Sequence, residues 1–130
     1  MVIVSSFRFV RRRLSPLAVA VGVLVSIAMP ISAHPALKQS SPAQGAVLDT
    51  APESLRLTFT EPVESAFTRV KVVDREGVEI TGSTVRADPG DPRIVVVALP
   101  ALHPGAFKAT WSALGRDGHR VTGELGFSVK

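Results

Sequence analysis

Hydrophobic and polar residues alternate along several segments of the chain. Apolar side chains occupy every second position over residues 55–59, 107–111 and 125–129. This period of two is typical of strands with one buried and one exposed face. Residues 94–99 are continuously apolar, which predicts a strand buried on both faces. Weaker patterns predict further strands over residues 36–40, 69–74 and 78–86.

Turn residues interrupt these segments at short intervals. The chain contains ten Gly and ten Pro, and both Glu76-Gly77 and residues 88–92 are typical of turns. About seven short strands within residues 34–130 predict an all-β fold, an antiparallel immunoglobulin-like sandwich with one core. Cysteine is absent, so disulfides, zinc–thiolate sites and thiol nucleophiles are excluded.

Residues 1–33 have the organisation of a secretory signal peptide. Basic residues precede an apolar stretch over residues 14–28, and the small residue Ala33 provides a cleavage site. The alternative is an uncleaved membrane anchor, but the apolar stretch is shorter than the ~20 residues that a spanning helix needs. We therefore expect a mature domain, residues 34–130, that begins at His34 and works outside the cytoplasm.

The positive charge of the chain belongs to this leader. Of the 15 Lys and Arg residues, four lie within residues 1–33, which leaves 11 basic residues against all 11 acidic residues in the rest. The mature domain is therefore formally neutral, and no nucleic-acid partner is predicted. It also lacks a Gly-x-Ser-x-Gly motif and a glycine-rich phosphate loop, so we do not expect an enzyme.

A metal site is better supported. Asp117-Gly118-His119 places a carboxylate and an imidazole two residues apart, on one face if the segment is extended. For this motif alone, a simple hairpin turn is the more ordinary interpretation.

Cleavage after Ala33 strengthens the metal hypothesis. It frees the α-amine of His34, and the amine and imidazole of one residue can chelate one ion, an arrangement called a histidine brace. Pro35 has no peptide N–H, so further ligands must come from elsewhere in the fold, and Asp117 and His119 can supply them. Three nitrogens and one carboxylate oxygen suit Cu(II), with Ni(II) and Zn(II) behind it.

Motifs at both ends of the domain carry a family resemblance. The opening motifs are His34-Pro35-Ala36-Leu37, Ser40-Ser41-Pro42-Ala43 and Leu57-Thr58-Phe59-Thr60-Glu61-Pro62. The closing motifs are Trp111-Ser112-Ala113-Leu114-Gly115-Arg116-Asp117-Gly118-His119, Val121-Thr122-Gly123 and Phe127-Ser128-Val129. In this order they resemble the CopC family of periplasmic copper-binding proteins, and the resemblance covers essentially all of residues 34–130.

The resemblance implies a Greek-key β-sandwich that holds one Cu(II) per chain. The family's ligand positions fall on the amine and imidazole of His34, on Asp117 and on His119. A nearby acidic position of the family falls on Glu61, which is either a weak ligand or neighbour of the site, or a solvated carboxylate at a strand end. Trp111 matches a core tryptophan of the family.

The implied role is buffering or delivery of copper in the periplasm, for copper homeostasis or resistance. The implied partners are the copper ion and a CopD-like inner-membrane protein. Some family members carry a methionine-rich loop for Cu(I), but the corresponding residues 72–78 contain no Met, which argues against a Cu(I) site.

Two other functions stay open from the sequence. One is a copper oxygenase that uses the histidine brace, although Asp117 would fill a position that oxygen needs. The other is a metal-free immunoglobulin-like structural module.

Three residues near these motifs are not assigned as ligands. His103 matches no ligand position of the family and is expected in an exposed loop. Arg116 and Arg120 are expected either to contact Asp117 or Glu61 or to be solvated.

Overall fold

The structure is a computed structural model that describes residues 34–80 and 82–130. The predicted signal peptide, residues 1–33, lies outside the described residues. No helix among the described residues is long and apolar enough to cross a membrane. The elements in chain order are β1 (Leu37–Ser41), β2 (Ala46–Leu48), β3 (Ser54–Phe59), the 3-10 helix η1 (Ser65–Phe67), β4 (Arg69–Asp74), β5 (Thr84–Ala87), β6 (Ile94–Ala98), β7 (Gly105–Leu114) and β8 (Arg120–Val129).

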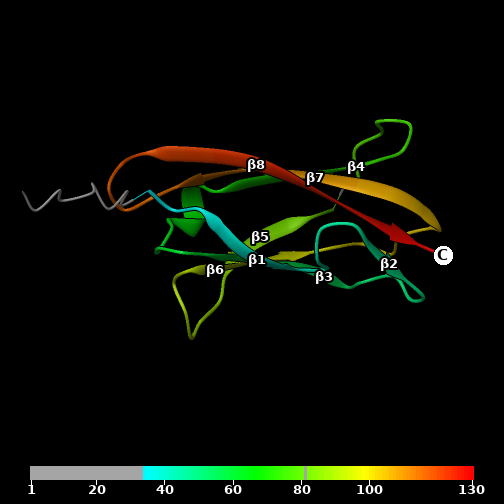
Figure 1. Ribbon diagram of the computed structural model, residues 1–130, viewed down its shortest axis with the longest axis horizontal. Coiled ribbons are helices and arrows are strands. Elements are labelled where there is room, and N and C mark those ends of the chain that lie inside the picture. The colour runs from blue at the N-terminus through cyan, green and yellow to red at the C-terminus, as the bar shows by residue number, and fades with distance from the viewer. Residues whose placement is uncertain (1–33, 81) are drawn as a thin grey trace, which may run out of the picture. The chain divides into compact units, whose positions relative to one another are not determined.

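The strands form two four-stranded sheets that pack face to face, as Figure 1 shows. One sheet has the order β1-β3-β6-β5 and the other β2-β8-β7-β4. The all-β, immunoglobulin-like Greek-key sandwich predicted from the sequence is confirmed. The expectation of purely antiparallel pairing is wrong for one strand, because β2 runs parallel to β8.

The core lies between the sheets and is built from the alternating positions of the sequence. Leu55, Leu57 and Phe59 of β3 are fully buried. They face the inward side chains of β7 and β8, which are Phe107, Ala109, Trp111, Ala113, Leu125, Phe127 and Val129. Burial of these apolar side chains is the main favourable term for folding, since the domain has no disulfide.

Two strand predictions need correction. β6 is not buried on both faces, because only Val95 and Val97 face the core while its other residues stay half-buried. The predicted strand over residues 78–86 is reduced to β5. Residues 78–80 instead pair briefly with β4, since the Asp74 N–H donates to the Val78 carbonyl and the Ile80 N–H donates to the Val72 carbonyl. In the turn before them, Asp74 Oδ1 accepts hydrogen bonds from the backbone N–H groups of Glu76 and Val78.

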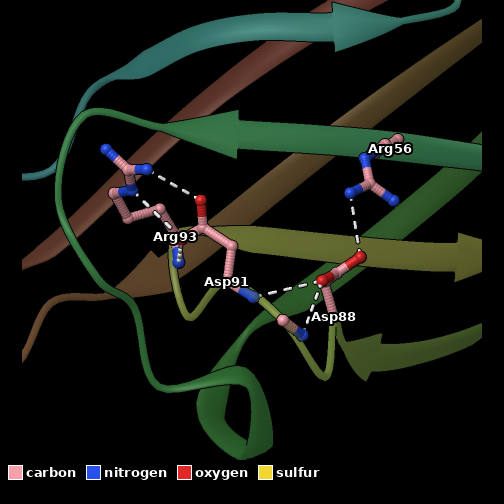
Figure 2. A network of polar contacts seen from close by, with 5 residues as sticks. Arg56, Asp88, Asp91 and Arg93 are labelled. Carbon is pink, nitrogen blue, oxygen red and sulfur yellow. Dashed lines mark hydrogen bonds and ion pairs between the residues drawn. The ribbon is translucent and has the colours of Figure 1, made fainter.

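The loop between β5 and β6 is held by two carboxylates (Figure 2). Asp88 Oδ1 accepts the backbone N–H groups of Gly90 and Asp91, and its other oxygen pairs with Arg56 of β3 at 2.8 Å. Arg93 donates both Nε and Nη2 to Asp91, and these hydrogen bonds lower the pKa of Asp91 to about 2. The turn predicted here is therefore a fixed loop tied to the neighbouring strand.

Candidate metal centre

The turn between β7 and β8 forms one half of the candidate site. Leu114 pairs with Arg120 at the mouth of the hairpin, and the Gly115 N–H donates to the carbonyl of His119 at 2.8 Å. Gly118 has a φ of +85°, a conformation that residues with a Cβ rarely adopt. The Asp117–His119 segment is therefore not extended. The hairpin-turn interpretation is right, and the turn itself brings the two side chains together.

The first described residues form the other half. The Ala36 N–H donates to Thr60 Oγ1 at 3.0 Å, and the Thr60 N–H donates back to the Ala36 carbonyl at 2.8 Å. These bonds extend the pairing of β1 with β3 and fix the chain just after Pro35, which is buried. Figure 1 shows the start of this segment at the same end of the sandwich as the β7–β8 turn.

Three side chains converge where these halves meet. Nδ1 of His34 lies 2.9 Å from Asp117 Oδ2, and Nδ1 of His119 lies 3.1 Å from the same oxygen. The other Asp117 oxygen accepts the backbone N–H of His119 at 3.0 Å. The two imidazole ring centroids are 4.3 Å apart. One ligand atom from each residue lies within 4.8 Å of the others, so the sequence-predicted residues His34, Asp117 and His119 form one cluster.

The cluster has a negatively charged carboxylate and is open to solvent, as a cation site requires. The hydrogen bond with His34 is the largest of the effects that lower the pKa of Asp117 to about 2, followed by the backbone N–H of His119 and then its side chain. Asp117 is therefore an anion at neutral pH. The side chains of His34, His119 and Asp117 are 50%, 64% and 27% exposed, so an ion can reach them from solvent.

The donor set is chemically suited to a borderline metal ion. Imidazole nitrogens and carboxylate oxygens bind zinc at roughly 2.0–2.2 Å, so ligands of one such ion lie up to about 4 Å apart. The three side chains need only small movements to reach that spacing. Imidazole favours Cu, Zn and Ni over the hard ions Mg and Ca.

Glu61 and His103 lie outside the cluster. Glu61 is not among the described residues whose ligand atoms converge with those of His34. Its charge acts instead on Arg93, whose pKa is raised chiefly by Asp91 and more weakly by Glu61. His103 is an exposed loop residue, as expected, with Nδ1 2.9 Å from the Pro104 carbonyl. It precedes the far end of β7, about 30 Å along the strand from the turn.

The flanking arginines do not pair with Asp117 or Glu61 among the described contacts. Arg116 Nε lies 3.6 Å from the carboxylate of Glu64, a neighbour that the sequence motifs did not single out. Arg120 donates to the Phe67 carbonyl and to Ser112 Oγ. Both arginines therefore brace the 3-10 helix region against the hairpin.

Trp111 has the core position that the resemblance implies. Its side chain is 7% exposed and meets Phe59 edge-to-face, with ring centroids 5.2 Å apart. Trp111 lies three residues before the end of β7. It is therefore a buried reporter on the strand that leads into the turn.

Comparison with known proteins decides the family. The model of the CopC domain family matches residues 37–130. The chain belongs to the CopC family. Copper resistance protein C of Pseudomonas syringae pv. tomato is 36% identical over 117 residues, which cover 85% of this chain and 90% of that protein. Copper transport protein CutJ of Bacillus subtilis (strain 168) is 32% identical over 75% of this chain, but the matched part spans only 18% of the length of CutJ.

Solved structures of the CopC family have the same fold. CopC from Methylosinus trichosporium OB3b superposes with a TM-score of 0.71 at 26% identity, covering 75% of this chain and 94% of that one. PcoC, described as a methionine-rich copper resistance protein from Escherichia coli, superposes with a TM-score of 0.68 at 29% identity, covering 75% of this chain and all of that one. The converging residues described above therefore lie on a CopC-family sandwich.

Proposed function

We propose that this CopC-family chain is exported, is cleaved after Ala33, and binds one Cu(II) ion through His34, Asp117 and His119. The α-amine freed by cleavage and Nδ1 of His34 form a chelate ring, Asp117 adds a carboxylate, and His119 adds a second imidazole. The observation that carries the proposal is that the Nδ1 atoms of His34 and His119 lie 2.9 and 3.1 Å from one carboxylate oxygen. Nitrogen and oxygen ligands of this kind favour Cu(II).

The physiological role that follows is copper buffering or delivery in the periplasm, without catalysis. The names of several relatives, copper resistance protein C and copper transport protein CutJ, support a role in copper handling. A side chain from Asp117 in the ligand set supports a carrier over an oxygenase, because it occupies a position that an oxygenase leaves open. A CopD-like membrane protein is the partner that the family resemblance suggests.

The proposed site is specific for Cu(II) rather than Cu(I). Cu(I) prefers soft thioether and thiolate ligands. The chain contains no Cys, and both of its Met residues, Met1 and Met29, precede the proposed cleavage site. This composition contrasts with PcoC, whose description names it methionine-rich.

The test starts from the full chain expressed with its leader and recovered from the exported fraction. Its N-terminus is determined by mass spectrometry, and the protein is then titrated with Cu(II) and followed by electron paramagnetic resonance. The proposal predicts His34 as the first residue, one Cu(II) per chain and nitrogen hyperfine structure. A different first residue, or a processed protein that retains no copper on dialysis, would contradict it.

A further inference from the structure

Gly115 lies at the point where both halves of the cluster meet. It is buried, it forms an isolated antiparallel bridge with Val63, and its carbonyl accepts the N–H of Gly118. A Cβ at this position would lie 2.6 Å from Asp117 Oδ1 and 2.9 Å from Cδ of Pro35. Both distances are shorter than real Cβ contacts allow, so a side chain here would displace the Asp117 carboxylate, the Pro35 ring or both.

These contacts link Gly115 to each of the three cluster residues. Asp117 packs its carboxylate against Gly115 directly. His119 is held through its carbonyl, which accepts the Gly115 N–H at 2.8 Å. His34 is held through Pro35, because the proline ring fixes its own φ and restricts the backbone of the preceding residue.

We propose that Gly115 and Pro35 are positioning residues that hold His34 onto the Asp117–His119 turn before any metal ion arrives. The inference rests on the proposed metal-binding function. Neither residue offers a side-chain ligand, because Pro35 has an apolar ring and Gly115 has no side chain. Their role is to remove the conformational cost of bringing together groups that are 83 residues apart.

The test compares Gly115→Ala with Gly126→Ala in the exported, processed chain. Gly126 is the matched control because it is a glycine of β8 that, like Gly115, has no positive φ, but at which a Cβ would lie no closer than 3.6 Å to its neighbours. The first readout is made without metal, by nuclear magnetic resonance of the His34 and His119 imidazoles and of contacts between Pro35 and residue 115. The second is the Cu(II) dissociation constant together with the paramagnetic resonance spectrum.

Gly115→Ala is expected to lose the Pro35 contact in the metal-free protein and to weaken Cu(II) binding at least tenfold. The near-ultraviolet signal of Trp111 is expected to match that of Gly126→Ala, since the atoms nearest to the added Cβ belong to Asp117 and Pro35 and not to the apolar core. Wild-type contacts and affinity in Gly115→Ala would overturn the inference. If the wild-type protein binds no copper, the proposed function fails, while the metal-free spectra still decide whether Gly115 positions His34.

A second variant keeps the inference testable if Gly115→Ala does not fold. Pro35→Ala removes Cγ and Cδ, the atoms that meet Gly115, and changes no residue of a strand. It is expected to broaden the His34 imidazole signals in the metal-free protein. Where both single variants fold, their effects on affinity are expected to be non-additive, because they break the same contact. Additive losses, or unchanged His34 signals in Pro35→Ala, would count against it.

Discussion

Asp117 Oδ2 lies 2.9 Å from Nδ1 of His34, a residue 83 positions earlier in the chain. Two separate structures produce this contact. The hydrogen bonds between Ala36 and Thr60 set the end of the first segment, and the β7–β8 hairpin sets the position of the turn. The proposed site therefore forms only in the folded sandwich, so we expect metal binding to stabilise the fold.

Cu(II) is accordingly expected to raise the melting temperature. A ligand that binds only the folded state stabilises it by about 2.7 kcal/mol at a free concentration of 100 times Kd. For a domain of this size that corresponds to a rise of about 10 °C or more. Calorimetry of the processed protein with and without Cu(II) measures the shift, and an unchanged transition at saturating copper would contradict the coupling.

Substitutions of the proposed ligand residues are expected to weaken Cu(II) binding far more than substitution of His103. Asp117→Asn keeps the shape of the side chain but removes its charge, and His119→Ala removes an imidazole. Each is expected to weaken Cu(II) binding by about 100-fold or more, since even residues that only orient ligands contribute about 10–100-fold. His103→Ala is the control, because His103 lies in a loop at the other end of β7. A large loss in His103→Ala measured by competition titration would mean that the ligand set is wrongly assigned.

Trp111 is expected to report copper binding by fluorescence. It is the single Trp of the chain, it is buried, and it lies about 10 Å along β7 from the start of the turn. Cu(II) has an unpaired electron and quenches nearby indoles, whereas the closed-shell ion Zn(II) does not. One equivalent of Cu(II) is expected to lower the emission, and Zn(II) to leave it unchanged. Full emission at copper saturation would place the ion elsewhere.

Acid stability is expected to depend on the loop between β5 and β6. Hydrogen bonds from Arg93 lower the pKa of Asp91 in the folded state from the usual 3.8 to about 2. Stability from this group is therefore fully present above about pH 4 and is lost as the pH falls toward 2. Asp91→Asn is expected to flatten the fall in melting temperature over this range.

A matched variant controls for the loss of a surface charge. Asp49 pairs with Lys130 but its side chain is 84% exposed, so Asp49→Asn is expected to follow the wild-type pH profile. Thermal melts of the three proteins between pH 6 and 2 make the comparison. Parallel curves for Asp91→Asn and wild type would show that the Arg93 pair adds nothing to acid stability.

Much of the fold was predictable because its main strands carry their own pattern. Alternation over residues 55–59, 107–111 and 125–129 identifies β3, β7 and β8, which supply most of the core. β2 carries no such pattern. It has only three residues, and its strand conformation comes from parallel pairing with β8, about 80 residues away. The local sequence pattern carries no information about pairing between residues so far apart in the chain.

Of the candidate site, too, one part was predictable from the sequence and another was not. The convergence of His34, Asp117 and His119 was predictable because ligand chemistry resides in side-chain types. A His directly after a predicted cleavage site and an Asp-Gly-His motif are both visible in the sequence. Gly115 was not predictable as part of the site. A glycine that is needed for close approach looks the same in one sequence as a glycine that is needed for a turn. Only the distances to Pro35 and Asp117 separate these roles.

The measurement that tests the central claim most directly compares two forms of the mature domain that differ by one residue. Residues 34–130 are released from a fusion by a protease that leaves either His34 or one additional Gly as the first residue, and both are titrated with Cu(II) under competition. If the α-amine of His34 is a ligand, the form that begins at His34 binds one Cu(II) at least 100-fold more tightly, and the paramagnetic resonance spectra differ. Equal affinities and identical spectra would contradict the account.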